Sequence, residues 1–231
     1  ALECLLYSAA ERGDAAARAA AERGLAAALD SPWWDRGRGF FRSPGESPLK
    51  ANARRARLFW DAHALTGDAR WRAAAEPMTG FLLHALRDPG VGAFRRAAGS
   101  DPAVYPAEGN AQAVLALLRA EAFGVSGAGE AAARALTFLQ TRLYDPLLGL
   151  VHAQGGGEES TVGLLGDAAW TALAFLEAYQ AGGLKSHRDF ADGLLRFLFQ
   201  ELWERDGGGF LDRLPRADDP PILREPHLDP A

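Results

Sequence analysis

Two carboxylic acids, Glu108 and Asp167, are the residues of this sequence whose type and position best fit catalytic chemistry. Each stands at the start of a stretch that has apolar residues at helical spacing. Glycoside hydrolysis uses two carboxyl groups that face one cavity, and one of them must hold a proton at neutral pH. We therefore name Glu108 and Asp167 as candidate catalytic residues. The alternative is structural, because an acidic side chain at a helix N-terminus stabilises the helix dipole without taking part in a reaction.

Five more residues are candidates for binding a substrate, with a carbohydrate as the possible ligand. Tyr105, Asn52 and Asn110 lie, like the two acids, near the starts of expected helices. His63 follows Asn52 by eleven residues, which places both within about 20° on one helix face. Trp170 occupies a position where the corresponding stretches of the chain carry arginine or alanine. For His63 a solvated last helical turn is the alternative, since the helix dipole favours histidine there.

Composition excludes several classes of site and partner. The single cysteine, Cys4, rules out a disulfide framework and a thiolate metal cluster, and no pair of histidines has metal-ligand spacing. The glycine run at 155–157 is followed by two glutamates, which would repel a phosphate. We therefore expect no metal and no cofactor. With 25 basic and 30 acidic side chains, a net charge of −5, the chain is not expected to bind nucleic acid. No apolar run reaches the ~20 residues of a membrane span.

The elements that must position these candidates follow a repeat of about 55–60 residues. In each copy a helix-like stretch ends, and a short turn leads to a glycine followed by apolar residues. Three copies continue with Asn52, Asn110 or Asp167, spaced by 58 and 57 residues, which we interpret as N-caps of apolar helices. The anchor glycines are Gly39, Gly92, Gly149 and Gly209.

Each repeat is predicted to be a helical hairpin, with an apolar inner helix and an outer helix that carries charged residues. The predicted hairpins are 1–29 (helices 1–12 and 14–29), 52–86 (52–66 and 68–86), 110–143 (110–123 and 129–143) and 167–203 (167–180 and 187–203). Strands should be limited to short pieces after the anchor glycines. Tandem hairpins with an apolar inner layer predict an all-α fold that is part of an (α/α) toroid.

Position within the repeat also predicts the core. Trp60, eight residues after Asn52, corresponds to apolar residues in the other copies, so we assign it to packing. Trp34 and Trp203 are assigned to the core in the same way, because they share a position with leucines in the other copies. A buried aromatic side chain hides about 150–250 Å2 of surface, so these tryptophans are expected to stabilise the fold.

Five segments of the chain occur in an order that resembles a known family. The segment 104–111 reads Val-Tyr-Pro-Ala-Glu-Gly-Asn-Ala, and the others are 163–170, 175–179, 202–212 and 223–225. Together they resemble the C-terminal toroid of the thioredoxin-domain proteins similar to human spermatogenesis-associated protein 20. The polar runs of that family are altered here: residues 46–53 keep little of one, and Phe41 stands where the family has histidine.

The resemblance implies an (α/α) toroid related to six-hairpin glycosidases and to sugar 2-epimerases. It also implies a thioredoxin-like domain upstream in the same chain and at least one more hairpin after residue 231. The repeat agrees, because the helix cap of the first hairpin would lie before residue 1. We therefore expect residues 1–231 to be one toroid domain within a longer, cytoplasmic protein.

Two functions stay open at this point. Loss of the family's polar runs favours a non-catalytic or vestigial module that supports the attached thioredoxin-like domain or binds a partner. Toroid ancestry favours the alternative, a carbohydrate-active enzyme that hydrolyses or epimerises a sugar near Glu108 and Asp167. The inner cavity distinguishes them, since an enzyme would line it with convergent carboxylates and a scaffold would fill it with apolar side chains.

Overall fold

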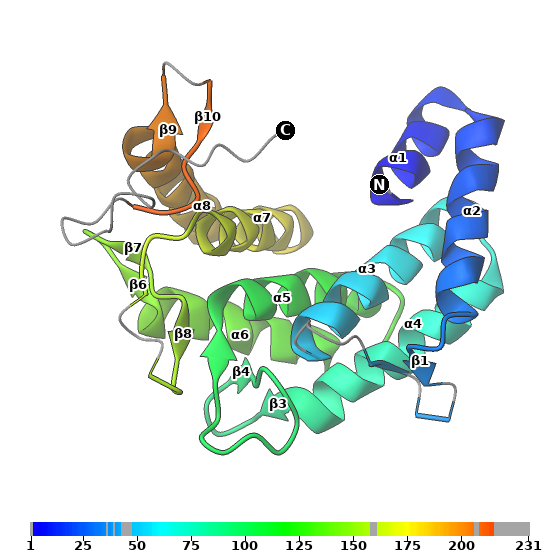
Figure 1. Cartoon of the computed structure of the whole chain (residues 1–231), viewed down its shortest axis with the longest axis horizontal. Helices are drawn as coiled ribbons and strands as arrows, with labels where there is room; N and C mark the ends of the chain where they lie inside the picture. Colours follow the sequence, from blue (N-terminus) through cyan, green and yellow to red (C-terminus); the bar gives the residue numbers. More distant parts are fainter. Residues whose placement is uncertain are drawn as a thin grey trace.

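The computed structural model describes residues 2–35, 37–38, 40–42, 48–157, 161–205 and 208–214. Helices dominate this part of the chain and form four hairpins (Figure 1). The first helices of the hairpins are α1 (Leu2–Arg12), α3 (Pro48–Thr66), α5 (Ala107–Ala122) and α7 (Leu165–Gly182). The second helices are α2 (Ala15–Leu29), α4 (Ala69–Phe81), α6 (Ala128–Arg142) and α8 (Lys185–Phe197), with π-helical turns η1 (Leu82–Leu86) and η2 (Leu198–Leu202) after α4 and α8. The predicted all-α architecture of helical hairpins is confirmed.

The helices form two layers, as the sequence predicts. In the inner layer α1 contacts α3, α3 contacts α5, and α5 contacts α7. The second helix of each hairpin packs on the outer side of the first, and the inner helices follow a curve around a common concave face (Figure 1). This arrangement is part of an (α/α) toroid. The charged residues Arg70, Arg72 and Glu76 of α4 are exposed, as predicted for an outer helix.

The outer helices α2 and α4 begin in the same way because the same short motif precedes both. Asp14 caps α2 by accepting hydrogen bonds from the backbone N–H groups of Ala16 and Ala17. Asp68 caps α4 by accepting one from Arg70. A glycine with positive φ stands directly before each aspartate, a backbone conformation that glycine adopts without strain.

Each helical hairpin is followed by a pair of short antiparallel strands joined by a turn, here called a β-turn. The antiparallel pairs are β1 (Trp34–Asp35) with β2 (Phe40–Phe41), β3 (Arg87–Asp88) with β4 (Ala93–Phe94), β6 (Tyr144–Asp145) with β7 (Gly149–Leu150), and β9 (Trp203–Glu204) with β10 (Gly209–Phe210). A fifth pair, β5 (Tyr105–Pro106) with β8 (Ala153–Gln154), joins two different repeats. The strands are as short as expected, but they are not limited to positions after the anchor glycines, since β3, β6 and β9 precede Gly92, Gly149 and Gly208.

One backbone hydrogen bond links consecutive repeats and recurs three times. The N–H groups of Leu49, Ala107 and Leu165, each in the first turn of an inner helix, donate to carbonyls of the following repeat. The three bonds are Leu49 to Arg96 at 3.2 Å, Ala107 to His152 at 2.8 Å, and Leu165 to Asp212 at 2.8 Å. These bonds satisfy backbone donors that helix starts leave without a partner, and they define equivalent positions in α3, α5 and α7.

The cap interpretation of Asn52, Asn110 and Asp167 is wrong. Asn52 and Asn110 lie within α3 and α5, and their side chains accept no N–H of their own helix: they bond to the preceding β-turn and to a carbonyl at the start of their helix. Asn52 Oδ1 accepts from the N–H of Phe41 at 2.7 Å, and Nδ2 donates to the carbonyls of Phe41 and Pro48 at 3.0 and 2.8 Å. Asn110 repeats this arrangement at the same distances.

The third anchor is also displaced by one residue. Because Leu49, Ala107 and Leu165 are equivalent, the residue that corresponds to Asn52 and Asn110 is Ala168. Asp167 therefore occupies the adjacent position and points elsewhere. A carboxylate could not have donated the two Nδ2 hydrogen bonds in any case.

Trp60 is fully buried as predicted, whereas the assignment of Trp203 to the core is wrong. Trp203 is 38% exposed, and its neighbour Leu202 is buried. The fourth anchor glycine is Gly208, since it has positive φ and donates to Glu204 as Gly92 donates to Asp88. Leu86 and Leu143 directly precede the first strand of their β-turns, and the residue at the same position in the fourth β-turn is Leu202. Trp34 packs against the core but is only partly buried.

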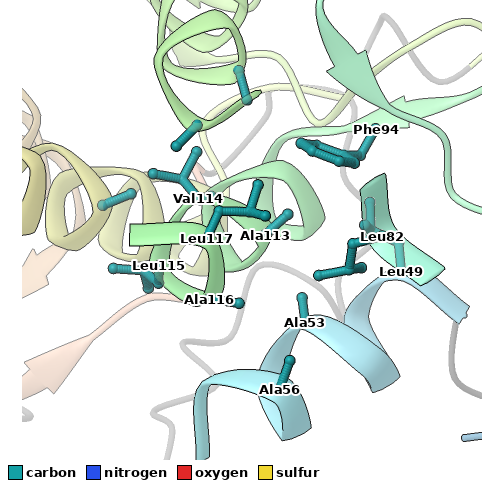
Figure 2. Close-up of a cluster of buried hydrophobic side chains, with 14 of the residues drawn as sticks. Leu49, Ala53, Ala56, Leu82, Phe94, Ala113, Val114, Leu115, Ala116 and Leu117 are labelled. Atoms are coloured by element: carbon teal, nitrogen blue, oxygen red, sulfur yellow. The ribbon is translucent and has the colours of Figure 1, made fainter. Parts of the chain in front are cut away.

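Small side chains allow the inner helices to approach closely. Figure 2 shows Leu49, Ala53 and Ala56 of α3 facing alanine, valine and leucine side chains of α5. Most of α5 is buried, because helices flank it on several sides. Alanine loses no side-chain entropy in a helix, so an alanine-rich centre both favours the helix and permits tight packing.

Several residues named from the sequence lie outside the described ones. They are Gly39, residues 46–47, the two glutamates Glu158 and Glu159, residues 206–207 and the segment 223–225. Among the described residues, no helix has the length and apolar character that crossing a membrane requires.

Candidate functional site

Three of the inner helices, α3, α5 and α7, each present a row of residues on the concave face. Lys50, Glu108 and Gly166 each directly follow the equivalent first-turn residues of α3, α5 and α7. One turn further along the helices come Arg54, Gln112 and Trp170, then Arg57 and Leu115, and then Asp61, Arg119 and Glu177. The intervals of four, three and four residues keep each row on one helix face.

Glu108 is held at the rim of this face by two side chains. Its Oε2 lies 2.6 Å from Lys50 Nζ, and its Oε1 accepts a hydrogen bond of 2.8 Å from Gln112 Nε2. Both carboxylate oxygens are therefore engaged. The ion pair joins α3 to α5, and the hydrogen bond from the Gln112 amide joins Glu108 to the next turn of its own helix.

Asp167 is adjacent to Glu108, and both of its carboxylate oxygens contact protein groups. Asp167 Oδ1 accepts from the backbone N–H of Glu108 at 3.2 Å, and Oδ2 lies 2.9 Å from His152 Nδ1. Asp167 is only 1% exposed. Burial raises the pKa of Asp167, while the hydrogen bond and charge of His152 act in the opposite direction. Asp167 thus orients His152 and the start of α5.

His152 is a functional candidate that sequence reasoning missed. Its backbone carbonyl accepts from Ala107, and its imidazole, 29% exposed, points at Asp167. These contacts depend on the pairing of β5 with β8, which brings the loop after β7 to the start of α5. No local pattern around His152 indicates that pairing. A carboxylate bound to Nδ1 fixes the orientation and tautomer of a histidine.

A pocket of about 390 Å3 lies between the inner helices, below the rim. Trp170 forms part of its α7 wall, and Gln112 forms part of its α5 wall. Gln112 is 2% exposed, and its Oε1 has no hydrogen-bond partner among the described residues. The lining residues are Leu2, Glu3, Arg54, Arg55, Arg57, Leu58, Gln112, Leu115 and Trp170. The accessible area of this oxygen is below 1 Å2, so protein atoms enclose it.

Ion pairs close the inner face below the pocket. Arg57 Nη2 contacts Glu177 Oε1 at 2.7 Å, which connects α3 to α7. Arg119 Nε lies 2.9 Å from Asp61 Oδ1, and Tyr7 Oη donates to Asp61 Oδ2 at 3.3 Å. Burial raises the pKa of Asp61, and the charges of Arg119 and Arg57 oppose that effect. All four inner helices contribute to this network.

The structure places the remaining sequence candidates away from the pocket. Asn52 and Asn110 are fully buried and bond to backbone. The hydroxyl of Tyr105 donates to Asp88 Oδ2 at 2.8 Å. His63 lies near the far end of α3, where its Nδ1 contacts the carbonyl of Asp68 at 3.0 Å. Of the five binding candidates, Trp170 alone lines the pocket, and the described residues contain no cluster of three His, Cys, Asp or Glu that could hold a metal.

Comparison with known proteins identifies the fold. No family model and no curated protein matches the sequence. A sugar epimerase from a ruminal bacterium superposes with a TM-score of 0.70 at 12% identity, over 93% of this chain and 63% of that one. Cellobiose 2-epimerase from Spirochaeta thermophila gives 0.63 at 21% identity, over 82% and 56%. The GH76A α-1,6-mannanase from Salegentibacter gives 0.72 at 17% identity, over 91% and 62%.

These structures belong to the six-hairpin glycosidase-like toroids, so the predicted architecture is confirmed. The chain spans between about half and two thirds of the length of these neighbours. An inactive variant of the mannanase is solved in complex with α-1,6-mannotetrose. At such low identities the likeness establishes the fold alone.

Proposed function

We propose that this chain is a saccharide-binding toroid module that does not hydrolyse its ligand. The observation that carries the proposal is the pocket, which is lined by Trp170 of α7 together with polar side chains of α3 and α5. A sugar ring has an apolar face that packs on an indole and hydroxyls that hydrogen-bond to polar side chains. The structural neighbours include a sugar epimerase and an α-1,6-mannanase, which supports the same ligand class.

The geometry of the two acids supports the non-catalytic part of the proposal. A glycosidase needs two carboxyl groups flanking the scissile bond, about 5–5.5 Å or 6.5–9.5 Å apart. Asp167 is buried, and both of its oxygens contact protein groups. Glu108 is held by Lys50 and Gln112. Both carboxyl groups are thus engaged by protein partners, which supports binding over hydrolysis.

A binding experiment tests the proposal. Titration calorimetry with glucose, mannose, cellobiose and α-1,6-mannobiose should detect binding to the 231-residue chain. Trp170→Ala should weaken the affinity about twofold to twelvefold, taking the packing of a sugar on the indole as equal to an aromatic pair, ~0.5–1.5 kcal/mol. Trp203→Ala is the matched control, since Trp203 is partly exposed but does not line the pocket. Equal affinities of wild type and Trp170→Ala would contradict the assignment of the pocket.

Hydrolysis is tested separately. We expect no release of reducing sugar from any of these disaccharides over a day of incubation. Turnover that Glu108→Gln abolishes would show that the non-catalytic part of the proposal is wrong.

A second candidate function is epimerisation or isomerisation of a sugar. The contact between His152 Nδ1 and Asp167 Oδ2 favours it, because an oriented imidazole can move a proton at neutral pH. Such an enzyme would incorporate deuterium at the sugar carbon next to the carbonyl group in D2O. Nuclear magnetic resonance would detect the exchange, and His152→Gln should abolish it if this function is present.

We also propose, from the family resemblance, that residues 1–231 form one domain of a longer thioredoxin-domain protein. The segments 104–111, 163–170 and 202–212 support this proposal, because they occur along the chain in the order of that family. The complete reading frame tests it, since a Cys-x-x-Cys motif in an upstream thioredoxin-like domain is expected. The cytoplasmic location stays a prediction.

A further inference from the structure

The four β-turns close in the same way. In each, the residue after the second strand donates its backbone N–H to the carbonyl of the residue before the first strand. These bonds are Arg42 to Trp33, Arg95 to Leu86, Val151 to Leu143 and Leu211 to Leu202. The residue that ends each second strand therefore directs its own N–H and C=O away from the partner strand. These residues are Phe41, Phe94, Leu150 and Phe210.

In the first two β-turns an asparagine of the following inner helix binds these outward groups. Asn52 bonds to the N–H and C=O of Phe41 at 2.7 and 3.0 Å, and Asn110 does the same for Phe94. In the third β-turn the backbone of the segment before α7 supplies a donor instead. In the fourth, no described residue bonds to the backbone N–H or C=O of Phe210.

The outer helix of the following hairpin also contacts each of the first three β-turns. The contacts are Phe40 with Phe81 of α4, Arg87 with Glu130 of α6, and Tyr144 with Phe190 of α8. No helix follows the fourth β-turn among the described residues. There Phe199 is 60% and Trp203 38% exposed, and both rings contact the ring of Phe210.

The flank of α7 is uncovered in the same direction. Leu49 of α3 faces α5 (Figure 2), and Trp60 on the same flank stacks on Phe123 at the end of α5, so both are fully buried. The corresponding residues of α7, Leu165 and Leu176, are apolar but only partly buried. Figure 1 shows that α7, α8 and the fourth β-turn form one end of the curved layer.

We infer that this end of the layer is the docking surface for a fifth helical hairpin, supplied by the chain beyond residue 231, whose inner helix carries an amide side chain that bonds to the backbone of Phe210. The continuation of the chain is the occupant because α3, α5 and α7 each pack on the β-turn that precedes them. A carboxamide can both accept from an N–H and donate to a C=O. The inference does not depend on saccharide binding, and it concerns the end opposite to the proposed thioredoxin-like domain.

A second copy of the chain lacks the amide that this surface requires. Asn52 and Asn110 are the two asparagines of the sequence, and both are fully buried. The inner helix of the first hairpin, α1, contains neither asparagine nor glutamine.

Hydrogen exchange of single amides, followed by nuclear magnetic resonance, tests the inference. The 231-residue chain is compared with a chain that is extended along its natural reading frame by one repeat of about 60 residues. In the extended chain the amide of Phe210 should exchange at least about tenfold more slowly, because it becomes bonded and buried. The amide of Phe94, which Asn110 already binds, is the internal control and should not change.

Two substitutions in the extended chain assign the protection to this surface. Alanine in place of the asparagine or glutamine near the start of the added inner helix should restore fast exchange at Phe210. Trp203→Glu should do the same, because it places a charge under the added hairpin without changing that hairpin. Leu184→Glu is the matched control, since Leu184 is an exposed leucine between α7 and α8, and it should have no effect.

The outcomes separate this inference from the other proposals. Equal exchange at Phe210 in the two chains overturns it, and so does an added inner helix without an amide side chain in its first two turns. Protection of Phe210 that grows with the concentration of the 231-residue chain also overturns it, because a second copy then covers the surface. Slow exchange that both substitutions abolish supports it. Sugar binding by the 231-residue chain is measured independently of all these results.

Discussion

Asn110→Ala should lower the free energy of unfolding by about 2–4 kcal/mol. Three hydrogen bonds end at this fully buried side chain: Oδ1 accepts from the N–H of Phe94 at 2.7 Å, and Nδ2 donates to the carbonyls of Phe94 and Pro106 at 3.0 and 2.8 Å. The alanine leaves these groups without their side-chain partner in the interior. An unpaired buried polar group costs ~1–3 kcal/mol, and the N–H suffers most because it has a single hydrogen to donate.

Asn110→Asp should be more destabilising than Asn110→Ala at pH 7. The second carboxylate oxygen replaces Nδ2 and faces two carbonyl oxygens that it cannot donate to. A proton on the carboxyl group relieves part of this repulsion, so the native-state pKa of the new aspartate lies above its ordinary value of about 3.9. The stability that the proton supplies is therefore present below about pH 4 and is lost as the pH rises through the native-state pKa.

Urea unfolding followed by far-ultraviolet circular dichroism measures these differences between pH 4.5 and 7.5. The matched control is Asn52, which makes the same three bonds at the same distances, so Asn52→Ala should cost a similar amount. The reasoning is refuted if Asn110→Asp is as stable as Asn110→Ala at pH 7. A loss below about 0.5 kcal/mol for Asn110→Ala, which is the size of an ordinary surface change, would refute it as well.

Two further predictions concern the β-turns. Asp88→Asn should flatten the acid side of a plot of melting temperature against pH, because hydrogen bonds from Arg95 and Tyr105 lower the pKa of Asp88 to about 2. The stability from this carboxylate is present above about pH 4 and is lost as the pH falls toward 2, so an unchanged acid limb would contradict the prediction. Gly149→Ala should lower the melting temperature, since φ is +81° and the added methyl group would lie 2.7 Å from the ring of Phe197. Gly182→Ala, where no atom lies within 4 Å, is the control and should have little effect.

The architecture could be predicted from the sequence because each helix carries its own signal. Apolar residues at helical spacing and glycines at the turns are local features. Register was harder to predict. A shift of one residue rotates a helical position by about 100°, so taking Asp167 instead of Ala168 as the repeat anchor changed which side chains were expected to share a face. In the same way, Gly208 and Gly209 are adjacent, and the wrong choice placed Trp203 in the core.

The site was predicted only in part, because its contacts join distant segments. Glu108 and Asp167 do meet, but through a backbone N–H that no sequence pattern indicates. His152 reaches Asp167 through the pairing of β5 with β8. Gln112 was overlooked because a glutamine within an apolar helix gives no sequence signal until its corrected register places it level with Trp170.

Because of the recurring hydrogen bond between repeats, the start of each inner helix depends on the repeat that follows it in the chain. In the first turns of α3 and α5, the N–H groups of Leu49 and Ala107 donate to carbonyls of the repeat that follows them, at Arg96 and His152. During synthesis each inner helix must therefore wait for a later part of the chain before its first turn is fully bonded. Repeat proteins are often described by the energy of the contacts between neighbouring repeats. Here each such hydrogen bond completes the helix of the earlier repeat and not that of the later one. Opening of the repeat that holds His152 should expose the amide of Ala107 to hydrogen exchange, whereas opening of the repeat before α5 should leave that amide protected.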